Sequence, residues 1–426
     1  MTDGMRLTPL DGAAILIMLA ATLGYLNTRF LRLPASVGLT AMGALASLMV
    51  VGLDRLLPDS EVARDIVAFI ASIDFHATLM DGMLSFLLFA GALHVDWSEM
   101  HRGRWPVLIL STAGTILSTV LIGLGFFALA HAIGFDVPFG WSLVFGALIS
   151  PTDPVAVLQV LKRTDVPPTL QATVAGESLF NDGVGVVLFS ILLAMALGTG
   201  DFSIGRATEL FLAQAGGGVL LGIVIGWVAF RAMKTIDEYN VEVMISLAVV
   251  MGGTVAARWL HVSGPVAMAV AGLLIGNHAV AQAMSDTTRD YLLKFWSVID
   301  DILNAVLFLL IGLEVVTIPG DARLLVIGAA AIPLVLAVRA ISVLLPLALL
   351  RPLLSPLLTL GPLAPVTLIW GGLRGGISVA LALGLPPGGA RSATLAATYV
   401  VVLFAVIVQG GSMDRVLARR RRRTAG

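Results

Sequence analysis

Residues 150–154 read Ser-Pro-Thr-Asp-Pro, and this polar stretch lies in the middle of an apolar segment that covers about residues 141–160. Two prolines three residues apart remove two backbone donors and clash with the preceding turn, so a helix breaks there. Residues 371–376, Gly-Gly-Leu-Arg-Gly-Gly, interrupt a second apolar segment of about residues 362–386, because glycine is a poor helix former. We therefore predict two discontinuous helices, with breaks near residues 150–154 and 371–376.

The composition of the chain indicates that the lipid bilayer is its solvent. The 426 residues are 58% hydrophobic and 12% charged, with a mean hydropathy of +0.97, whereas about 25% charged residues is typical of soluble proteins. Too few polar residues remain to cover the surface of a water-soluble fold. The chain has no cysteine and its six histidines show no metal-ligand spacing, which excludes disulfides and thiolate metal sites. We expect an all-α polytopic membrane protein that holds no cofactor.

Apolar segments of about 20 residues, the length that spans the hydrocarbon, recur along the whole chain. The first segment has no basic leader and no small-residue cleavage site, so we expect it to remain as a helix. The expected spans number about thirteen and lie near residues 11–27, 35–53, 76–95, 107–131, 141–160, 168–198, 207–230, 241–257, 263–280, 298–316, 323–349, 362–386 and 392–412.

Lysine and arginine set the expected orientation, because basic loops stay on the cytoplasmic side. With the N-terminus outside, the outer side carries seven of the 26 basic residues and the inner side carries seventeen, or eleven without Arg415 and the run Arg419 to Arg423. We expect a multi-pass protein of the plasma (cell inner) membrane with a cytoplasmic C-terminus. The terminal arginines could also bind nucleic acid or anionic lipid, but we interpret them as a cytoplasmic retention signal and expect no nucleic-acid partner.

The two broken segments also predict how the chain is organised. They are the fifth and the twelfth segment, an odd number apart, so they cross the membrane in opposite directions. Interrupted helices at matching positions of two halves are the sequence signature of an inverted-repeat secondary transporter with its site at the midplane. We expect one membrane domain over residues 1–414, with repeats of roughly 1–200 and 207–414, and a short basic tail over residues 415–426.

Charged residues within the apolar segments mark the candidate site, since a charge at the bilayer centre costs on the order of 2.5 to 3.5 kcal/mol. We give little weight to Asp81, near the outer end of its segment, and to three residues that we expect to flank a helix at the interface: Asp300, Asp301 and Glu314. Five charged residues require a partner, a cavity or a functional role, namely Asp153, Glu177, Asp182, Arg339 and Arg374.

The sixth segment positions its polar residues by helical geometry. At about 100° per residue, Ser178 and Asp182 share one face, and Asn181 lies beside them. We infer that these three residues face the break at Thr152 and Asp153.

Glu177 lies about 140° from Asp182 around the same helix, so it faces a different partner. Arg339 is the best candidate for that partner. Arg374, within the second break, would offset the negative charge of helix C-termini and carboxylates. We interpret its role as architectural.

At these residues the chain resembles the monovalent cation/proton antiporter superfamily, on the branch of the NhaP-type antiporters and the animal sodium/proton exchangers. The resemblance implies a dimer of thirteen-helix protomers, each built around two crossed, unwound helices. The motifs that carry it cover nearly the whole chain and follow in order: Thr152-Asp153-Pro154, Glu177-Ser178 with Asn181-Asp182, residues 302–308 (Ile-Leu-Asn-Ala-Val-Leu-Phe) with residues 311–314 (Ile-Gly-Leu-Glu), and residues 371–376.

The resemblance also implies roles for single residues. Asp182 would bind cation and proton alternately, while Asp153, Ser178 and the backbone carbonyl of Thr152 would complete a sodium site. Three residues would support that site: Asn181, Glu177 and Arg339. The chain departs from some relatives, which place an acidic residue near Ala90, because residues 88–92 are wholly apolar here.

We predict that the protein exchanges sodium, and also lithium, for protons by alternating access, with both ions competing for Asp182. Transport should therefore fall at acidic pH. Asn181 cannot titrate, so we expect electroneutral one-for-one exchange. Carboxylate, hydroxyl and carbonyl oxygens suit hard monovalent cations in general, so a potassium/proton antiporter is the nearest alternative. An ion channel would need a selectivity filter or a ring of charges, and the sequence contains no such segment. An enzyme would need a nucleophile with its base or a set of metal ligands, and we find none in the sequence.

Overall fold

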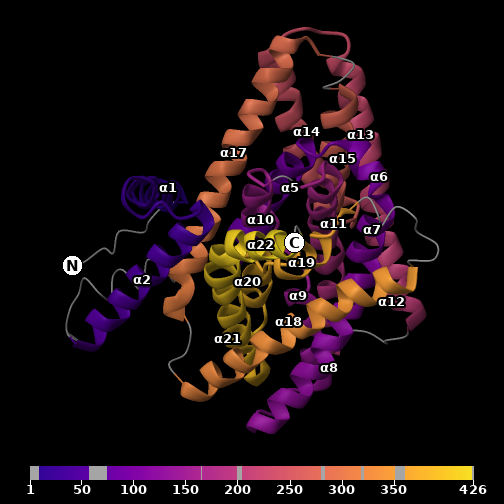
Figure 1. Cartoon of the computed structure of the whole chain (residues 1–426). Helices are drawn as coiled ribbons and strands as arrows, with labels where there is room; N and C mark the ends of the chain where they lie inside the picture. Colours follow the sequence, from indigo (N-terminus) through magenta and orange to yellow (C-terminus); the bar gives the residue numbers. More distant parts are fainter. Residues whose placement is uncertain are drawn as a thin grey trace, which may run out of the picture.

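The computed structural model describes residues 9–56, 74–164, 166–198, 204–279, 284–317, 321–350 and 360–424. Within these ranges the chain is helical apart from turns, short connections and one isolated β-bridge (Figure 1). Ten helices of the described ranges are long and apolar enough to cross a membrane, judged by length and composition. The chain is thus an all-helical polytopic membrane protein. Three of the basic residues counted for the orientation, namely Arg6, Arg64 and Arg351, lie outside the described residues.

Each apolar segment expected from the sequence overlaps one or more helices, and several helices continue through π-helical turns. The first part of the chain forms α1 (Pro9–Leu26), η1 (Asn27–Leu31), α2 (Ala35–Leu56), α4 (Phe75–Ala77), η2 (Thr78–Met83), α5 (Leu84–Leu93), α6 (Trp97–Arg102), α7 (Arg104–Ile109), η3 (Leu110–Gly114), α8 (Thr115–Ile133), α9 (Phe139–Ile149), α10 (Val155–Leu161) and α11 (Pro168–Ala196).

The second part of the chain continues in the same manner. It forms α12 (Ile204–Phe211), η4 (Leu212–Gly216), α13 (Gly217–Met233), α14 (Tyr239–Trp259), α15 (Gly264–Leu274), η5 (Ile275–Ala279), α17 (Asp286–Leu313), the 3-10 turn η6 (Glu314–Thr317), α18 (Ala322–Leu350), α19 (Ala364–Trp370), α20 (Gly376–Leu383), α21 (Gly389–Leu403), η8 (Phe404–Gly410) and α22 (Gly411–Thr424).

Both interruptions expected from the sequence correspond to gaps between helices. Helix α9 ends at Ile149 and α10 begins at Val155, so residues 150–154 are not helical. Helix α19 ends at Trp370 and α20 begins at Gly376, which leaves residues 371–375 between them. Each of the two apolar segments therefore forms a pair of half-helices.

Helix α17 differs from the expectation for residues 298–316, because it begins twelve residues earlier, at Asp286. The side chain of Ser285 accepts a hydrogen bond from the backbone N–H of Thr288 and caps the helix, as serine commonly does at this position. Asp300 and Asp301 consequently lie inside the helix, and the prediction that they flank it was wrong. Glu314 directly follows the last residue of α17, as expected.

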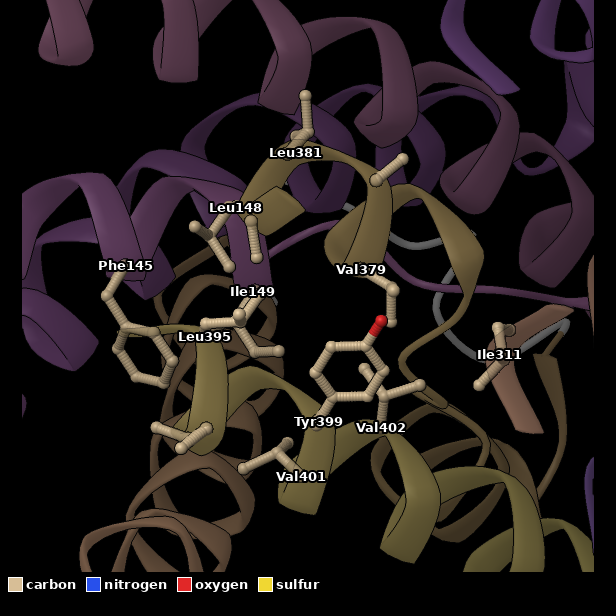
Figure 2. Packing of buried hydrophobic residues seen from close by; sticks show 14 of the residues in the cluster. Phe145, Leu148, Ile149, Ile311, Val379, Leu381, Leu395, Tyr399, Val401 and Val402 are labelled. Carbon is tan, nitrogen blue, oxygen red and sulfur yellow. The ribbon is translucent and has the colours of Figure 1, made fainter. Parts of the chain in front are cut away.

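A large hydrophobic cluster packs the half-helices α9 and α20 against α21 (Figure 2). Tyr399 of α21 is fully buried between them. The rings of Phe145 on α9 and Phe126 on α8 lie 4.1 Å apart, centre to centre. A Cβ atom at Gly146 would collide with the backbone carbonyl of Thr119, so this glycine permits the close approach of α8 and α9.

A second cluster surrounds Trp296 of α17 and includes residues of α5, α13, α14 and α15. The Trp296 indole is fully buried, donates a hydrogen bond from Nε1 to Ser246 Oγ at 2.9 Å, and packs against the ring of Phe89 at 4.7 Å. These contacts fix the rotation of α17 about its axis. Asp300 follows one helical turn later and therefore lies on the face that Trp296 buries.

Candidate functional site

The two helix breaks contact each other although they lie far apart in the sequence. The backbone N–H of Asp153 donates to the carbonyl oxygen of Leu373 at 2.9 Å, and these residues form the isolated antiparallel β-bridge. The contact satisfies backbone groups that lipid could not satisfy. It brings the adjoining ends of the half-helices α9, α10, α19 and α20 together, near the middle of the molecule in Figure 1.

Asp153 lies at the N-terminal end of α10 and is partly fixed by it. Its Oδ1 accepts a hydrogen bond from the backbone N–H of Val155 at 2.9 Å, an interaction that the helix dipole strengthens. A Cβ atom at Gly375 would lie 2.5 Å from Asp153 Oδ2, so the second break passes too close to tolerate a side chain. Glycine at position 375 thus lets the break approach the carboxylate.

Thr152 is held by two residues of α11 through a network of three hydrogen bonds. Its backbone N–H donates to Asn181 Oδ1 at 3.2 Å, and Asn181 Nδ2 donates to Thr152 Oγ1 at 2.8 Å. The hydroxyl groups of Thr152 and Ser178 lie 3.0 Å apart and share one further hydrogen bond. All three side chains are buried. The face of α11 inferred from helical spacing therefore does contact the first break.

Asp182 lies on that face of α11 but behaves differently from its neighbours. Its side chain is only 7% exposed, and within the described residues it makes no side-chain hydrogen bond or ion pair. The Asp153 carboxylate is close enough to interact with it electrostatically. A buried carboxylate without a partner is costly, so this position calls for a proton or a cation.

Glu177 is buried on another face of α11 and pairs with Arg339 of α18. The two side chains form a bidentate ion pair, with Arg339 Nη1 2.6 Å from Glu177 Oε1 and Nη2 3.1 Å from Oε2. Arg339 also donates from Nε and Nη2 to the carbonyl oxygen of Leu368 on α19, at 3.0 and 2.7 Å. The pair expected from the sequence is present, and it ties α11 and α18 to the half-helix α19.

Arg374 is fully buried within the second break. Its Nη1 donates to the carbonyl oxygens of Ser150 and Pro151, the latter at 3.0 Å. These carbonyls follow the C-terminus of α9, where the helix dipole is negative. The guanidinium therefore occupies the place at the helix end that a cation favours, and its architectural role stays a prediction.

A cavity of about 260 Å³ lies next to the first break, and its wall includes the exposed residues Lys162 and Asp301. Ser178 and Asn181 do not line it; they support Thr152 from behind. The predicted residues that do line it are Thr152, Asp153 and Asp182. The remaining wall includes Leu88 and Gly91 of the apolar stretch of α5, so that helix supplies no carboxylate at this depth.

Several polar residues on the cavity wall were not recognised as site residues from the sequence, and three of them, Asp300, Asn304 and Ser378, lie on α17 and α20. Asp300 and Asn304 lie four residues apart on α17, and both line the cavity. Ser378 of α20 also lines it and is buried, with no hydrogen-bond partner for its Oγ in the described part of the chain. Asp300 and Asn304 could have been found from Ser285, because a serine at the start of a helix predicts that the helix begins there and extends through Asp300.

Comparison with known proteins gives a consistent result over almost the entire chain. A model of the sodium/hydrogen exchanger transmembrane family matches residues 16–419. The Na(+)/H(+) antiporter NhaP of Pseudomonas aeruginosa is 46% identical over 433 aligned positions, which cover 96% of each chain. The Na(+)/H(+) antiporter NhaH of Halobacillus dabanensis is 34% identical, with 95% of this chain and 96% of that protein covered.

The fold is similar to that of the sodium proton antiporter MjNhaP1 from Methanocaldococcus jannaschii, whose structure at pH 8 aligns with a TM-score of 0.73. The alignment covers 96% of this chain and 98% of that one at 19% sequence identity, so this likeness concerns the fold alone. The match to the family model and the two relatives above 30% identity establish the family. The chain belongs to the sodium/hydrogen exchanger family.

Proposed function

We propose that the protein exchanges sodium for protons across the plasma membrane, with both ions competing for Asp182. The observation that carries the proposal is the state of this side chain: it is nine-tenths buried, lines a cavity and makes no hydrogen bond with the described residues. A carboxylate in such a place is stable when it holds a proton or a metal cation. The names of the relatives NhaP and NhaH support sodium and protons as the exchanged ions.

The cation in this proposal is held by oxygen atoms from both α11 and the first break. Asp182 and Asp153 supply carboxylate oxygens, and the backbone carbonyl of Thr152 supplies a third ligand. Ser178 contributes either directly or by orienting the Thr152 hydroxyl, with which it shares a hydrogen bond. Hard monovalent cations prefer such oxygen ligands, so we expect lithium to be accepted as well.

The stoichiometry that we propose is one proton for one cation. Asn181 is an amide that cannot titrate, and it is already engaged with Thr152 through two hydrogen bonds. Glu177 is neutralised by Arg339, and Asp153 accepts a hydrogen bond from the backbone N–H of Val155. We therefore assign the exchange of ligand to Asp182, which has no such partner within the described residues. A carboxylate that trades one monovalent cation for one proton carries the same charge in both states, so the exchange is electroneutral.

At the level of the fold we propose alternating access by two inverted repeats, of roughly residues 1–200 and 207–414, in a thirteen-helix protomer that forms a homodimer. Half-helices that meet at membrane depth are typical of transporters of this kind. The distribution of lysine and arginine supports an external N-terminus and a cytoplasmic C-terminus. Residues 415–426 would then form the cytoplasmic basic tail.

The test is sodium-driven proton movement in liposomes that contain the full-length protein and a pH-sensitive dye. We expect Asp182→Asn to reduce the signal to that of empty liposomes. Asp290→Asn, which removes an exposed carboxylate of α17 that pairs with Lys294 at 2.5 Å, is the matched control and should leave the signal intact. For the unmodified protein, acidification should raise the sodium concentration needed for half-maximal rate, because protons then occupy Asp182 more often.

Exchange that continues in the Asp182→Asn variant would refute the proposal. Replacing sodium by lithium should preserve transport, whereas an equal or greater rate with potassium would assign the protein to potassium instead. Discrete current steps across a planar bilayer would identify a channel.

A further inference from the structure

Helix α17 brings a third carboxylate to the cavity that contains Asp153 and Asp182. Asp300 is half-buried and lines the cavity wall together with the exposed Asp301 and the buried Asn304. It comes from a helix that supplies none of the residues assigned to the central site. The α5 stretch at residues 88–92, which faces the same cavity through Leu88 and Gly91, has no acidic residue. Within the described residues, the carboxylates that line the cavity in addition to Asp153 and Asp182 are therefore those of Asp300 and Asp301.

The position of Asp300 is fixed, yet one of its two carboxylate oxygens is available to bind a ligand. Asn304 Nδ2 donates to Asp300 Oδ1 at 3.0 Å, and Oδ2 has no hydrogen-bond partner among the residues that the structure describes. One turn before Asp300, the buried indole of Trp296 is held by Ser246 of α14, so α17 cannot rotate this side chain out of the cavity. A carboxylate that is held in place and half-satisfied can accept a further positive ligand.

Several charged or titratable groups surround Asp300 from other elements. The Asp153 carboxylate and the His94 imidazole at the end of α5 are close enough to act on it electrostatically, and Asp301 adjoins it on α17. Lys162 lines the same cavity. The carboxylates on the cavity wall number four in the described chain, namely Asp153, Asp182, Asp300 and Asp301. Aligned charges of one sign in a recess concentrate counter-ions.

Two observations that do not involve α17 indicate that this cavity receives a ligand. Asp182 is nine-tenths buried and has no hydrogen-bond partner among the described residues, although it lines the cavity. Ser378, on the half-helix α20, lines the same cavity, and its buried hydroxyl is also unpartnered within the described chain. Polar atoms of this kind are rare in folded proteins unless water or an ion satisfies them.

We propose that Asp300, backed by Asn304 and Asp301, forms a second cation site in which sodium is held, partly hydrated, before it reaches Asp182. The proposal rests on the function proposed above and adds a step to it. The cavity of about 260 Å³ has room for a cation with several waters, so the ion can be held by one protein carboxylate while water supplies its other ligands. Asp300 thereby raises the local sodium concentration without taking part in proton exchange at Asp182.

The test is the dependence of sodium-driven proton movement on sodium concentration in liposomes. Asp300→Asn should raise the KM for sodium about fivefold, the order expected for loss of one partly screened charge contact, while kcat at saturating sodium stays within about twofold of the unmodified protein. Asp300→Glu keeps the charge and should restore most of the affinity. Asp290→Asn is the control, because it removes the same charge from α17 at an exposed position that does not line the cavity.

An unchanged KM in Asp300→Asn would overturn the proposal. It would also be overturned if Asp300→Glu were as impaired as Asp300→Asn with a loss of kcat in both, because that pattern belongs to a structural role. The outcome for Asp182→Asn is separate: exchange that persists in that variant refutes the proposed function, whatever Asp300 does.

A second measurement isolates the proposed site without transport. Sodium that binds the folded state raises the midpoint of thermal unfolding, and Asp182→Asn removes the central carboxylate. We expect a sodium-dependent rise, relative to choline at equal ionic strength, to persist in Asp182→Asn and to vanish in the double variant Asp182→Asn/Asp300→Asn. An equal rise in the single and double variants would show that sodium does not bind at Asp300, and the absence of any rise in the single variant would do the same.

Discussion

Glu177 and Asp182 are both acidic, both buried and only five residues apart on α11, yet their surroundings are opposite. Glu177 accepts two hydrogen bonds from Arg339, which in turn contacts α19. Asp182 faces a cavity and has no such partner in the described structure. The difference separates two uses of charge within a membrane: a fully paired carboxylate stabilises the assembly of helices, whereas an unpaired carboxylate next to a cavity can exchange what it binds.

The contacts around the half-helices allow one carboxylate to be paired and the other to remain unpaired. Arg374 neutralises the carbonyl groups at the end of α9, and Asn181 and Ser178 fix Thr152. The broken backbone is thereby satisfied by permanent contacts and does not require the transported ion. Asp182, which makes no contact of this kind within the described residues, is the carboxylate that the proposed exchange uses.

The largest effect that we predict on stability is the removal of the buried ion pair. Glu177→Gln leaves the buried Arg339 without its counter-charge, and breaking a buried pair in this way costs about 3–5 kcal/mol. The Arg339 contacts to the Leu368 carbonyl persist, so we expect a value near the lower limit. Chemical denaturation in detergent micelles, followed by the fluorescence of the seven tryptophans, measures the change.

Asp182→Asn is the matched control on the same helix. It removes an equally buried carboxylate that has no partner among the described residues, so we expect the free energy of unfolding to change by less than about 1 kcal/mol or to increase. If Asp182→Asn were as destabilising as Glu177→Gln, the distinction between a paired structural carboxylate and an unpaired exchanging one would fail.

An intermediate effect is expected when an amide beside Asp182 is replaced by a carboxylate. Asn181→Asp places a second carboxylate next to Asp182 and removes the amide that donates to Thr152 Oγ1. The new carboxylate can bind a second proton, so a cycle can move more than one proton for each cation. We expect the rate of exchange to change about twofold or more when a membrane potential is imposed with valinomycin and a potassium gradient, since each elementary charge contributes about 2.3 kcal/mol per 100 mV.

The unmodified protein should give the same rate with and without that potential. A voltage-dependent rate in the unmodified protein would exclude electroneutral exchange. A rate that is independent of voltage in Asn181→Asp, with transport retained, would show that position 181 does not determine the charge moved.

Local sequence patterns predict the two helix breaks and most of the contacts around them. The two prolines at 151 and 154 and the glycines around Arg374 locate the breaks because their effect on a helix is local. Helical spacing alone separates Glu177 from the face that carries Ser178. The partner of Glu177 could be inferred because very few basic residues lie within the apolar segments.

Long-range packing accounts for what was missed. The sequence prediction placed this span at residues 298–316, whereas α17 begins at Asp286 and extends beyond its apolar part. Whether Asp300 faces lipid, protein or a cavity depends on how Trp296 packs against α14, and that packing is not encoded near Asp300 in the sequence. The same holds for Ser178, which lies behind Thr152 and does not line the cavity.

The smallest effect that we predict concerns an exposed ion pair, which can be compared with the buried pair of Glu177 and Arg339. Arg258 Nη1 of α14 lies 3.7 Å from Asp81 Oδ1 of η2, and the side chains of Asp81 and Arg258 are 63% and 59% exposed. An exposed pair at this distance contributes about 0–1 kcal/mol and weakens as salt screens it. We therefore expect Asp81→Asn to lower the free energy of unfolding by less than about 1 kcal/mol, with a difference that shrinks as salt is added to the denaturation assay. A loss of several kcal/mol that did not respond to salt would mean that Asp81 is as important to the structure as Glu177, and that burial is not what distinguishes the two pairs.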